Sequence, residues 1–207
     1  MFNLLPKDEN FFEDLDALAS SVRMSAEHLN ELIKRFPNID KELIAIELQR
    51  QSARQRMQTA MVRLDNAFIT PLDREDILNL IGQLRIVVDR VADLSQRFRL
   101  YRLPNLYPNL SSQSANLLSL ATEVQAIIAR LRSDTSLKSA TERLDTTRVL
   151  IELVTQDRER FLGELFAGDP DPIELIKKKE LHDLLEDALE RLDNVTLTLA
   201  AVLLKNG

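Results

Sequence analysis

The feature of this sequence that most constrains its fold is a three-and-four spacing of apolar residues that recurs along most of the chain. An α-helix has about 3.6 residues per turn, so this spacing gathers the apolar side chains on one helical face. The pattern runs through residues 11–36, 39–68, 71–103, 110–131, 137–165 and 172–202. The sequence therefore predicts an all-α fold of six long helices.

Turn residues are scarce, which also favours helices. Only 4 glycines and 7 prolines occur in 207 residues, too few for the many turns of an all-β fold. Short breaks predict antiparallel neighbours, packed as two three-helix bundles or as one elongated six-helix bundle. Residues 104–109 hold two prolines and two asparagines near the midpoint of the chain. We therefore expect one domain with two three-helix halves, 1–103 and 104–207.

Two of the breaks contain helix-start signals. Thr70 is the predicted N-cap of the third helix, with Pro71 as its first residue and Asp73 as a capping acid. Asp171 and Pro172 are expected to fill the first two roles at the start of the last helix. The preceding helices should end just before these segments.

Composition excludes several classes of function. The chain has no cysteine, so disulfides, thiolate metal sites and cysteine nucleophiles are excluded. No run of about 18 apolar residues is present, and residues 1–10 lack the apolar core of a signal peptide. A net charge of −6 disfavours nucleic acid as a partner. We expect a cytoplasmic protein that is peripheral to a membrane at most.

The strongest candidate for a binding site is a run of acids on the last predicted helix. Asp183, Glu186, Asp187, Glu190 and Asp193 recur at three- and four-residue spacing, roughly opposite the apolar face. One interpretation is a solvated acidic face. The other is a multi-carboxylate site for a hard or borderline cation, which would relieve the repulsion between neighbouring carboxylates.

Two arginines interrupt otherwise apolar helical faces. Arg50 does so on the second predicted helix and Arg158 on the fifth. Each could extend its charge to solvent at the edge of the bundle. Each could instead form a buried ion pair or contact an anion.

The sequence gives little support for catalysis. His28 and His182 are the only histidines, and both are flanked by surface-type helix residues. Neither belongs to a metal-binding helix motif, and no glycine-rich phosphate loop or nucleophile elbow is present. Glu47 and Asp65 lie near an apolar face without a recognisable pocket. We expect a protein that acts by binding rather than an enzyme.

Three stretches of the sequence carry a resemblance to a known family. They are residues 4–12 (LLPKDENFF), residues 68–77 (FITPLDREDI), and a last-helix stretch that begins at 176–181 (IKKKEL) and continues to residue 206. Together they resemble the PhoU-like family whose members accompany Pit-type phosphate transporters. The central stretch is the most specific of the three.

This resemblance implies a fold and a role. The fold would be the PhoU fold, with two related three-helix bundles in one chain. The role would be that of a cytoplasmic accessory or regulatory protein of inorganic phosphate transport, which binds a Pit-type transporter or a signalling protein. Some family members bind iron or zinc through acidic motifs with a Glu/Asp-x-x-x-Asp form. Here that form is met by Glu186 and Glu190, so the implied metal ligands are Asp183, Glu186, Asp187 and Glu190.

The first half departs from the acidic pattern of the family. Acids would be expected where Ser52, Arg54 and Arg85 stand, and only Asp89 is retained. A guanidinium cannot ligate a cation, so we predict that a first-half metal site is lost. Arg85 is expected to pair with Asp89 one helical turn away.

Other functions remain open from the sequence. One is a helical scaffold or self-associating bundle without a link to phosphate, and another is a metal-dependent phosphohydrolase that uses the acids of the last helix. Apolar pairs outside the main helical faces, Leu118 with Ala121 and Leu197 with Leu204, would allow a homodimer.

Overall fold

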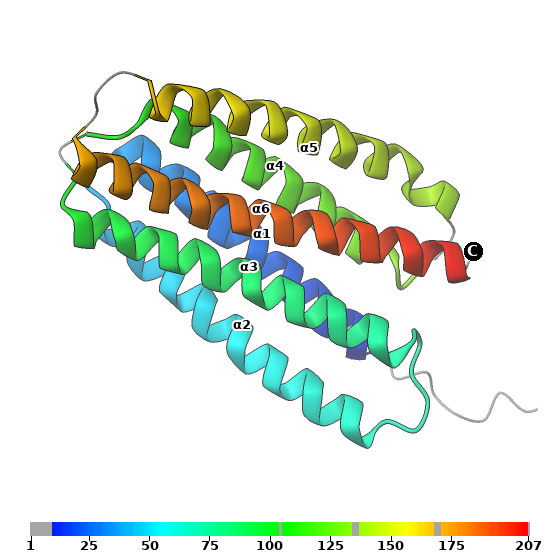
Figure 1. The fold of residues 1–207 in the computed structure, drawn as a ribbon. Helices are drawn as coiled ribbons and strands as arrows, with labels where there is room; N and C mark the ends of the chain where they lie inside the picture. The colour runs from blue at the N-terminus through cyan, green and yellow to red at the C-terminus, as the bar shows by residue number, and fades with distance from the viewer. Residues whose placement is uncertain (1–9, 104, 134–136, 168–170, 207) are drawn as a thin grey trace, which may run out of the picture.

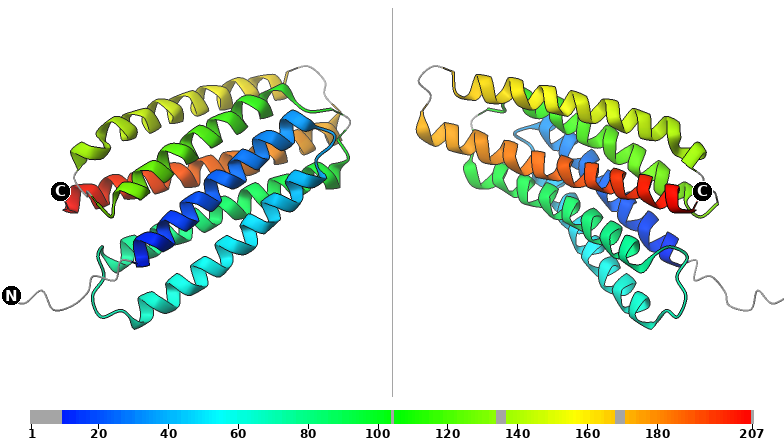
Figure 2. Two further views of the ribbon diagram at one scale, coloured as in Figure 1. Left: turned by 180° about the vertical axis from the view of Figure 1, so that it is seen from behind. Right: turned by 45° about the vertical axis from the view of Figure 1, so that its right-hand side comes forward.

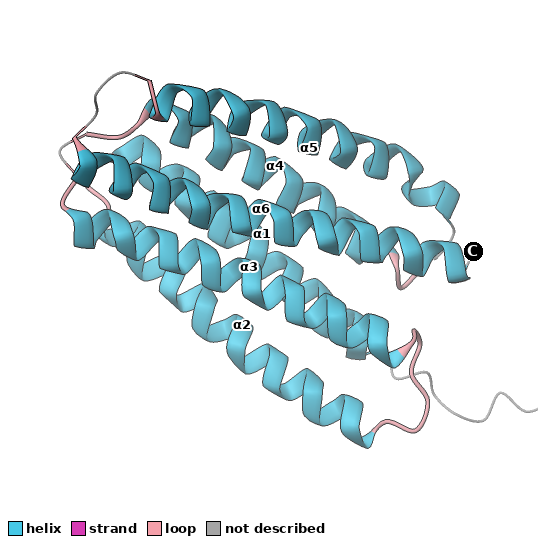
Figure 3. Cartoon of the chain, viewed as in Figure 1, coloured by secondary structure: helices cyan, strands magenta, loops and turns pink. Residues whose placement is uncertain are grey.

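The computed structural model describes residues 10–103, 105–133, 137–167 and 171–206, which are helical and contain no strand (Figure 3). Two sequence features lie partly outside the described residues: residues 4–9 of the stretch 4–12, and Pro104 of the predicted connector 104–109. The helices are α1 (Asn10–Arg35), α2 (Asp40–Asn66), α3 (Arg74–Tyr101), α4 (Pro108–Arg130), α5 (Leu137–Leu165) and α6 (Pro172–Asn206). The predicted all-α fold of six long helices is confirmed.

The six helices form an elongated bundle in which α1, α3, α4 and α6 are central (Figures 1 and 2). The outer helix α2 packs on α1 and α3, and the outer helix α5 packs on α4 and α6. The two halves meet through corresponding helices, since α1 contacts α4 and α3 contacts α6. Within the described ranges, neither outer helix contacts the other half, so each leaves one side exposed.

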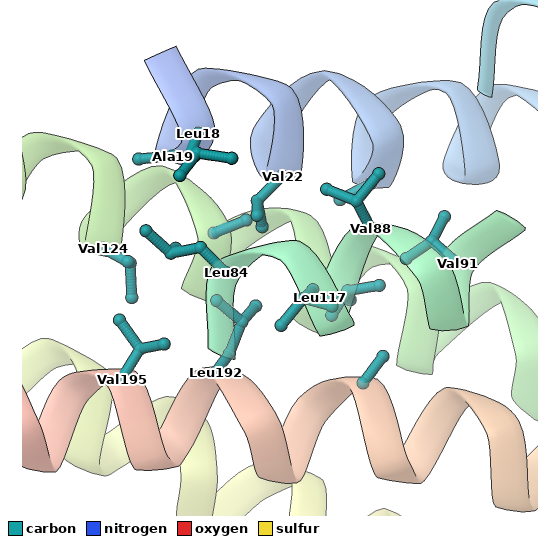
Figure 4. Close-up of a cluster of buried hydrophobic side chains, with 14 of the residues drawn as sticks. Leu18, Ala19, Val22, Leu84, Val88, Val91, Leu117, Val124, Leu192 and Val195 are labelled. Atoms are coloured by element: carbon teal, nitrogen blue, oxygen red, sulfur yellow. The ribbon is translucent and has the colours of Figure 1, made fainter. Parts of the chain in front are cut away.

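The hydrophobic core lies where the central helices meet (Figure 4). Side chains from all four of them interdigitate there, including Leu18, Leu84, Leu117 and Leu192, which are fully buried. Each such side chain stabilises the fold by about 1.5–3 kcal/mol relative to an exposed position. The core follows the apolar spacing of the sequence and fixes the third helix of each half against the other.

The outer helix α5 is less buried than its spacing predicts. Leu144, Ile151 and Val154 of the predicted apolar face are only partly buried. Val149 and Leu153 are exposed on the opposite side of the helix. The incomplete packing leaves space between α5 and its neighbour α6.

The start of α3 differs from the sequence prediction. The helix begins at Arg74, with Asp73 in the N-cap position, so the prediction of Thr70 as N-cap and Pro71 as first helical residue is wrong. Leu72 is buried in the core, and the Thr70 hydroxyl donates a hydrogen bond to its carbonyl at 2.7 Å. Burial of Leu72 therefore holds the chain in a turn for three residues beyond the predicted start.

Arg74 explains how α2 ends close to this turn. The helix ends at Asn66, two residues before the predicted end at Phe68. The guanidinium of Arg74 donates hydrogen bonds to the carbonyl oxygens of Leu64, at 3.0 Å, and Ala67. These carbonyls lie at the end of α2, where no intrahelical donor is available. Arg74, which belongs to the stretch 68–77 noted in the sequence, thus links the end of α2 to the start of α3.

The predicted start of α6 is confirmed. The helix begins at Pro172, and the backbone N–H of Ile173 donates a 2.8 Å hydrogen bond to a carboxylate oxygen of Asp171. Asp171 therefore caps the helix as its position before a proline predicts.

Candidate functional site

Two adjoining cavities of about 370 and 160 Å³ lie between α5 and α6. They share Ile151 and Asp193, and we call them together the α5–α6 groove. The larger is lined by Thr141, Leu144, Asp145, Thr147, Arg148, Ile151, Glu152, Asp193, Thr196, Leu197 and Ala200. The smaller is lined by Leu120, Ile151, Val154, Thr155, Arg158, Glu186, Leu189, Glu190 and Asp193. The groove combines apolar walls with several carboxylates.

Helical spacing explains which acids reach this groove. Glu186, Glu190, Asp193 and Leu197 follow one another at intervals of three or four residues, so they share one face of α6. This face is turned toward α5, because all four residues line the two cavities. The predicted acidic run is thus divided between different faces of the helix.

The other two predicted metal ligands point elsewhere. Both carboxylate oxygens of the exposed Asp183 accept hydrogen bonds from Lys179, at 2.7 and 2.8 Å. Asp187 pairs with Arg191 at 3.2 Å and with Arg90 on α3. Lys179, Arg90 and Arg191 therefore already neutralise these acids.

The described side chains do not fit a metal ion as they stand. No group of three or more His, Asp or Glu residues in the described ranges is arranged to hold one. Metal binding through Asp183, Glu186, Asp187 and Glu190 stays a prediction. It would require Asp183 and Glu186 to leave their cationic partners.

Arg158 lies at the edge of the groove and pairs with Glu186, its Nε 2.7 Å from a carboxylate oxygen. Its side chain is 54% exposed, so this arginine extends to solvent at the edge of the bundle and its ion pair is not buried. Burial raises the pKa of Glu186 and outweighs the opposing effect of Arg158.

Asp193 is an acid of the groove that lacks a cationic partner among the described residues. It is partly buried, and burial, with a smaller contribution from the charge of Glu190, raises its pKa. Neither Asp193 nor Glu190 forms an ion pair or hydrogen bond with any residue that the structure describes. A carboxylate that loses water without gaining a donor is destabilised in its charged form.

The corresponding acid of the first half is fully paired. Asp89 on α3 precedes Asp193 by 104 residues, the same offset that relates the buried Val88 to the buried Leu192. Arg50 and Arg54 of α2 approach one oxygen of Asp89 at 3.1 and 3.2 Å. The predicted pairing of Arg85 with Asp89 is also confirmed.

Arg50 forms the most buried of these contacts. Its side chain is only 18% exposed, and it also donates a 2.8 Å hydrogen bond to Asp93. Burial lowers the pKa of Arg50, but the charges of Asp93 and Asp89 outweigh this effect, so the pKa is raised. Of the two interpretations, the ion pair is the one that Arg50 follows, and the pair is partly buried.

The second half keeps one of the three matching guanidinium groups, Arg158, which stands 104 residues after Arg54 and pairs with Glu186 rather than with Asp193, whereas the other two positions are apolar. Leu189 stands 104 residues after Arg85, and Ile151 and Val154 line the cavity from α5. The sequence signal for this difference was the offset between Asp89 and Asp193. The presence of a groove could not be read from it, because the incomplete packing of α5 is a tertiary feature.

His182 was predicted to sit among surface residues, and this is wrong. It is 2% exposed and stacks on Phe161 with ring centroids 4.1 Å apart. Its Nδ1 lies 3.0 Å from the side-chain amide of Gln113, and its Nε2 makes no hydrogen bond. Burial lowers the pKa of His182 to about 4, so the ring is neutral at pH 7 and acts in packing.

The two apolar pairs that were predicted to allow a homodimer differ in their exposure to solvent. Ala121 is buried in the core and Leu118 is partly buried against the core, so this pair offers little exposed surface. Leu197 and Leu204 are exposed, and they continue the groove face of α6 toward its carboxyl end.

Comparison with known proteins first defines the class of fold. Two crystal structures from Shewanella oneidensis MR-1 superpose on 94% of this chain and 99% of their own, with TM-scores of 0.81 and 0.75. One is described as a PhoU-like protein and the other as a "putative PhoU-like phosphate regulatory protein". Their sequence identities are 14% and 15%. The chain therefore has a PhoU-like fold of two related three-helix bundles, as predicted.

Two known proteins are similar to this chain in sequence. A protein of Rhizobium meliloti (strain 1021) named "Putative pit accessory protein" is 25% identical over 98% of this chain and 96% of its own length. The UPF0111 protein YkaA of Bacillus subtilis (strain 168) is 26% identical over 70% of each chain. No family model matches the chain. The resemblance noted in the sequence is confirmed by these similarities.

Among the described residues, none of the helices is both long enough and apolar enough to cross a membrane.

Proposed function

We propose that this protein is a cytoplasmic accessory or regulatory protein of inorganic phosphate transport, which binds a Pit-type transporter or a signalling protein. The observation that carries this proposal is the similarity to the named pit accessory protein over nearly the whole of both chains. The PhoU-like fold of the described helices supports it independently.

The proposed mechanism is binding without turnover. The buried histidine is neutral and lies in the core, and most acids of α6 are paired with arginine or lysine. The α5–α6 groove, with its apolar walls and unpaired carboxylate, has the character of a binding surface. A metal-dependent phosphohydrolase that uses the acids from Asp183 to Glu190 would instead require phosphoester turnover that is lost in Glu190→Gln.

Phosphate uptake in cells that lack the protein tests this proposal. We expect altered uptake of inorganic phosphate in the deletion strain and restoration by the wild-type gene. Uptake that is unchanged by the deletion would contradict the proposed role and favour a helical scaffold unrelated to phosphate.

Iron or zinc on the acids of α6 is a second proposal and does not contribute to this mechanism. It is supported by the resemblance in the sequence, whereas the ion pairs of Asp183, Glu186 and Asp187 oppose it. Elemental analysis of the tag-free protein beside Glu186→Gln/Glu190→Gln tests it. The proposal requires stoichiometric metal that disappears in the variant, and metal-free protein in both samples would refute it.

A further inference from the structure

The position of Asp193 between two cavities indicates what kind of group could complete the α5–α6 groove. Its carboxylate is shared by both cavities and has no ion pair or hydrogen bond among the described residues. Leu144, Ile151 and Leu197 line the larger cavity together with it, as do polar residues such as Thr147 and Arg148. A purely apolar ligand would cover a charge without compensating it, which is unfavourable.

The first half of the molecule provides an internal template for the missing group. There, the guanidinium of Arg50 extends from α2 onto Asp89 and Asp93 of α3. The corresponding carboxylate of the second half lacks such a cation from α5. A guanidinium or ammonium supplied from outside would reproduce the contact that the chain makes for itself in the first half.

The charge of the groove favours the same kind of ligand. Five carboxylates and two guanidiniums are among the lining residues of the two cavities. Both guanidiniums lie near carboxylates of the groove, Arg148 at 3.7 Å from Asp145 and Arg158 at 2.7 Å from Glu186. An anionic ligand or an anionic membrane surface would be repelled, whereas a cationic ligand would be attracted.

The shape of the groove favours a helical segment of another protein. The larger cavity, about 370 Å³, falls in the range of known ligand pockets of roughly 300–1,000 Å³ and runs along two helices. Leu197 is 61% exposed, and Leu204 extends the same apolar face by two further turns of α6. An amphipathic helix laid between α5 and α6 could bury these leucines with its apolar face.

We propose that the α5–α6 groove is the docking site for an amphipathic helix of the partner protein, whose arginine or lysine side chain pairs with Asp193 and Glu190. This inference rests on the proposed function, because it specifies where and how the partner binds. In this proposal the second half of the molecule binds the partner, whereas the corresponding acid of the first half is paired with arginines of the same chain.

The test compares Asp193→Asn with Asp183→Asn, which removes the same charge from the same helix outside the groove. The probe is the Pit-type transporter of the same cells in lipid nanodiscs, with a chelator present to exclude bridging by metal. We expect roughly tenfold or greater loss of affinity for Asp193→Asn, the size of effect for a charge-assisted contact, and less than about twofold for Asp183→Asn. Equal binding by wild type and Asp193→Asn would overturn the docking site and leave the proposed function intact.

A peptide arm separates failure of the docking site from failure of the proposed function. A labelled amphipathic helix of leucine, alanine and glutamine with one central arginine is compared with the same peptide carrying glutamine at that position. If the transporter does not bind at all, preference of wild type but not Asp193→Asn for the arginine peptide still supports the docking site. Equal binding of both peptides, or a wild-type dimer that Asp193→Asn dissociates, overturns it.

Discussion

The third helices of the two halves carry the same acid in opposite environments. Asp89 on α3 is contacted by Arg50 and Arg54 of α2 and by Arg85 of its own helix. Asp193 on α6 faces a groove with apolar walls and has no cationic partner among the described residues, since Arg148 and Arg158 of the groove lie near Asp145 and Glu186. The two halves therefore share one arrangement of helices, but ion pairs neutralise the acid of the first half and leave the acid of the second half without a partner.

The difference teaches that a PhoU-like half can use its outer helix in two ways. In the first half, the outer helix contributes charge to the bundle and is held by ion pairs that are partly removed from solvent. In the second half, the outer helix contributes apolar side chains, several of them only partly buried, and its Arg143 and Arg158 pair with Glu123 and Glu186 rather than with Asp193. We propose that the second half, whose groove is open, recognises another protein.

The largest expected effect concerns pH and the buried His182 of the second half. Its pKa is lowered to about 4 in the folded chain, while an unfolded histidine has a value near 6.5. The unfolded chain therefore binds a proton first as the pH falls, and this single group should cost roughly 3 kcal/mol of stability between pH 6.5 and 4. Above pH 6.5 its contribution should be constant.

Urea unfolding of wild type and His182→Gln at pH 7 and pH 4.5 checks this expectation. Glu186 and Asp193 have raised pKa values, so their uptake of protons favours the folded chain as pH falls and acts in the opposite direction. Both proteins retain these acids, so the difference between them reports His182 together with its contact to Glu186, whose carboxylate oxygen lies 3.5 Å from Nε2. An identical loss of stability in both would show that His182 does not titrate as described.

The next effect contrasts the arginines of the two outer helices. Arg50→Met should destabilise the protein by about 2 kcal/mol, because Asp89 and Asp93 lose a partly buried cation. Arg158→Met should cost less than about 1 kcal/mol, because its pair with Glu186 is more exposed to solvent. Chemical denaturation measures both, and a larger loss for Arg158→Met would reverse the comparison.

The smallest expected effect belongs to the acid that serves as the control. Among the residues that the structure describes, Asp183 pairs only with Lys179, one turn away on an exposed face of α6. Asp183→Asn should therefore change the free energy of unfolding by no more than about 0.5 kcal/mol. A loss well above this value, measured by the same denaturation, would mean that Asp183 has a structural role and is unsuitable as a control.

The sequence predicted most of the fold because helical spacing is a local signal. The six helices, the cap at Asp171 and the pair of Arg85 with Asp89 depend on neighbours within one or two turns. The start of α3 could not be predicted in this way, because burial of Leu72 holds the chain outside the helix that Thr70 and Pro71 would begin.

The candidate site was only partly predictable for a similar reason. Spacing placed the acids of α6 on its polar side, but it could not show which neighbouring helix each one meets. Asp187 faces Arg90 of α3, whereas Glu190 and Asp193 face the groove beside α5. The burial of His182 also depends on a partner from another helix, Phe161. Such contacts follow from the packing of whole helices.

The most direct test of the difference between the halves is the free energy of unfolding of Asp89→Asn and Asp193→Asn, measured side by side in urea at pH 7. We predict that Asp89→Asn loses about 2–3 kcal/mol, because three arginines lose their shared carboxylate. Asp193→Asn should be neutral or more stable by up to about 0.5 kcal/mol, since its repulsion with Glu190 is removed. Equal destabilisation by the two substitutions would contradict the view that the first half is closed by its own cations and the second is open for a partner.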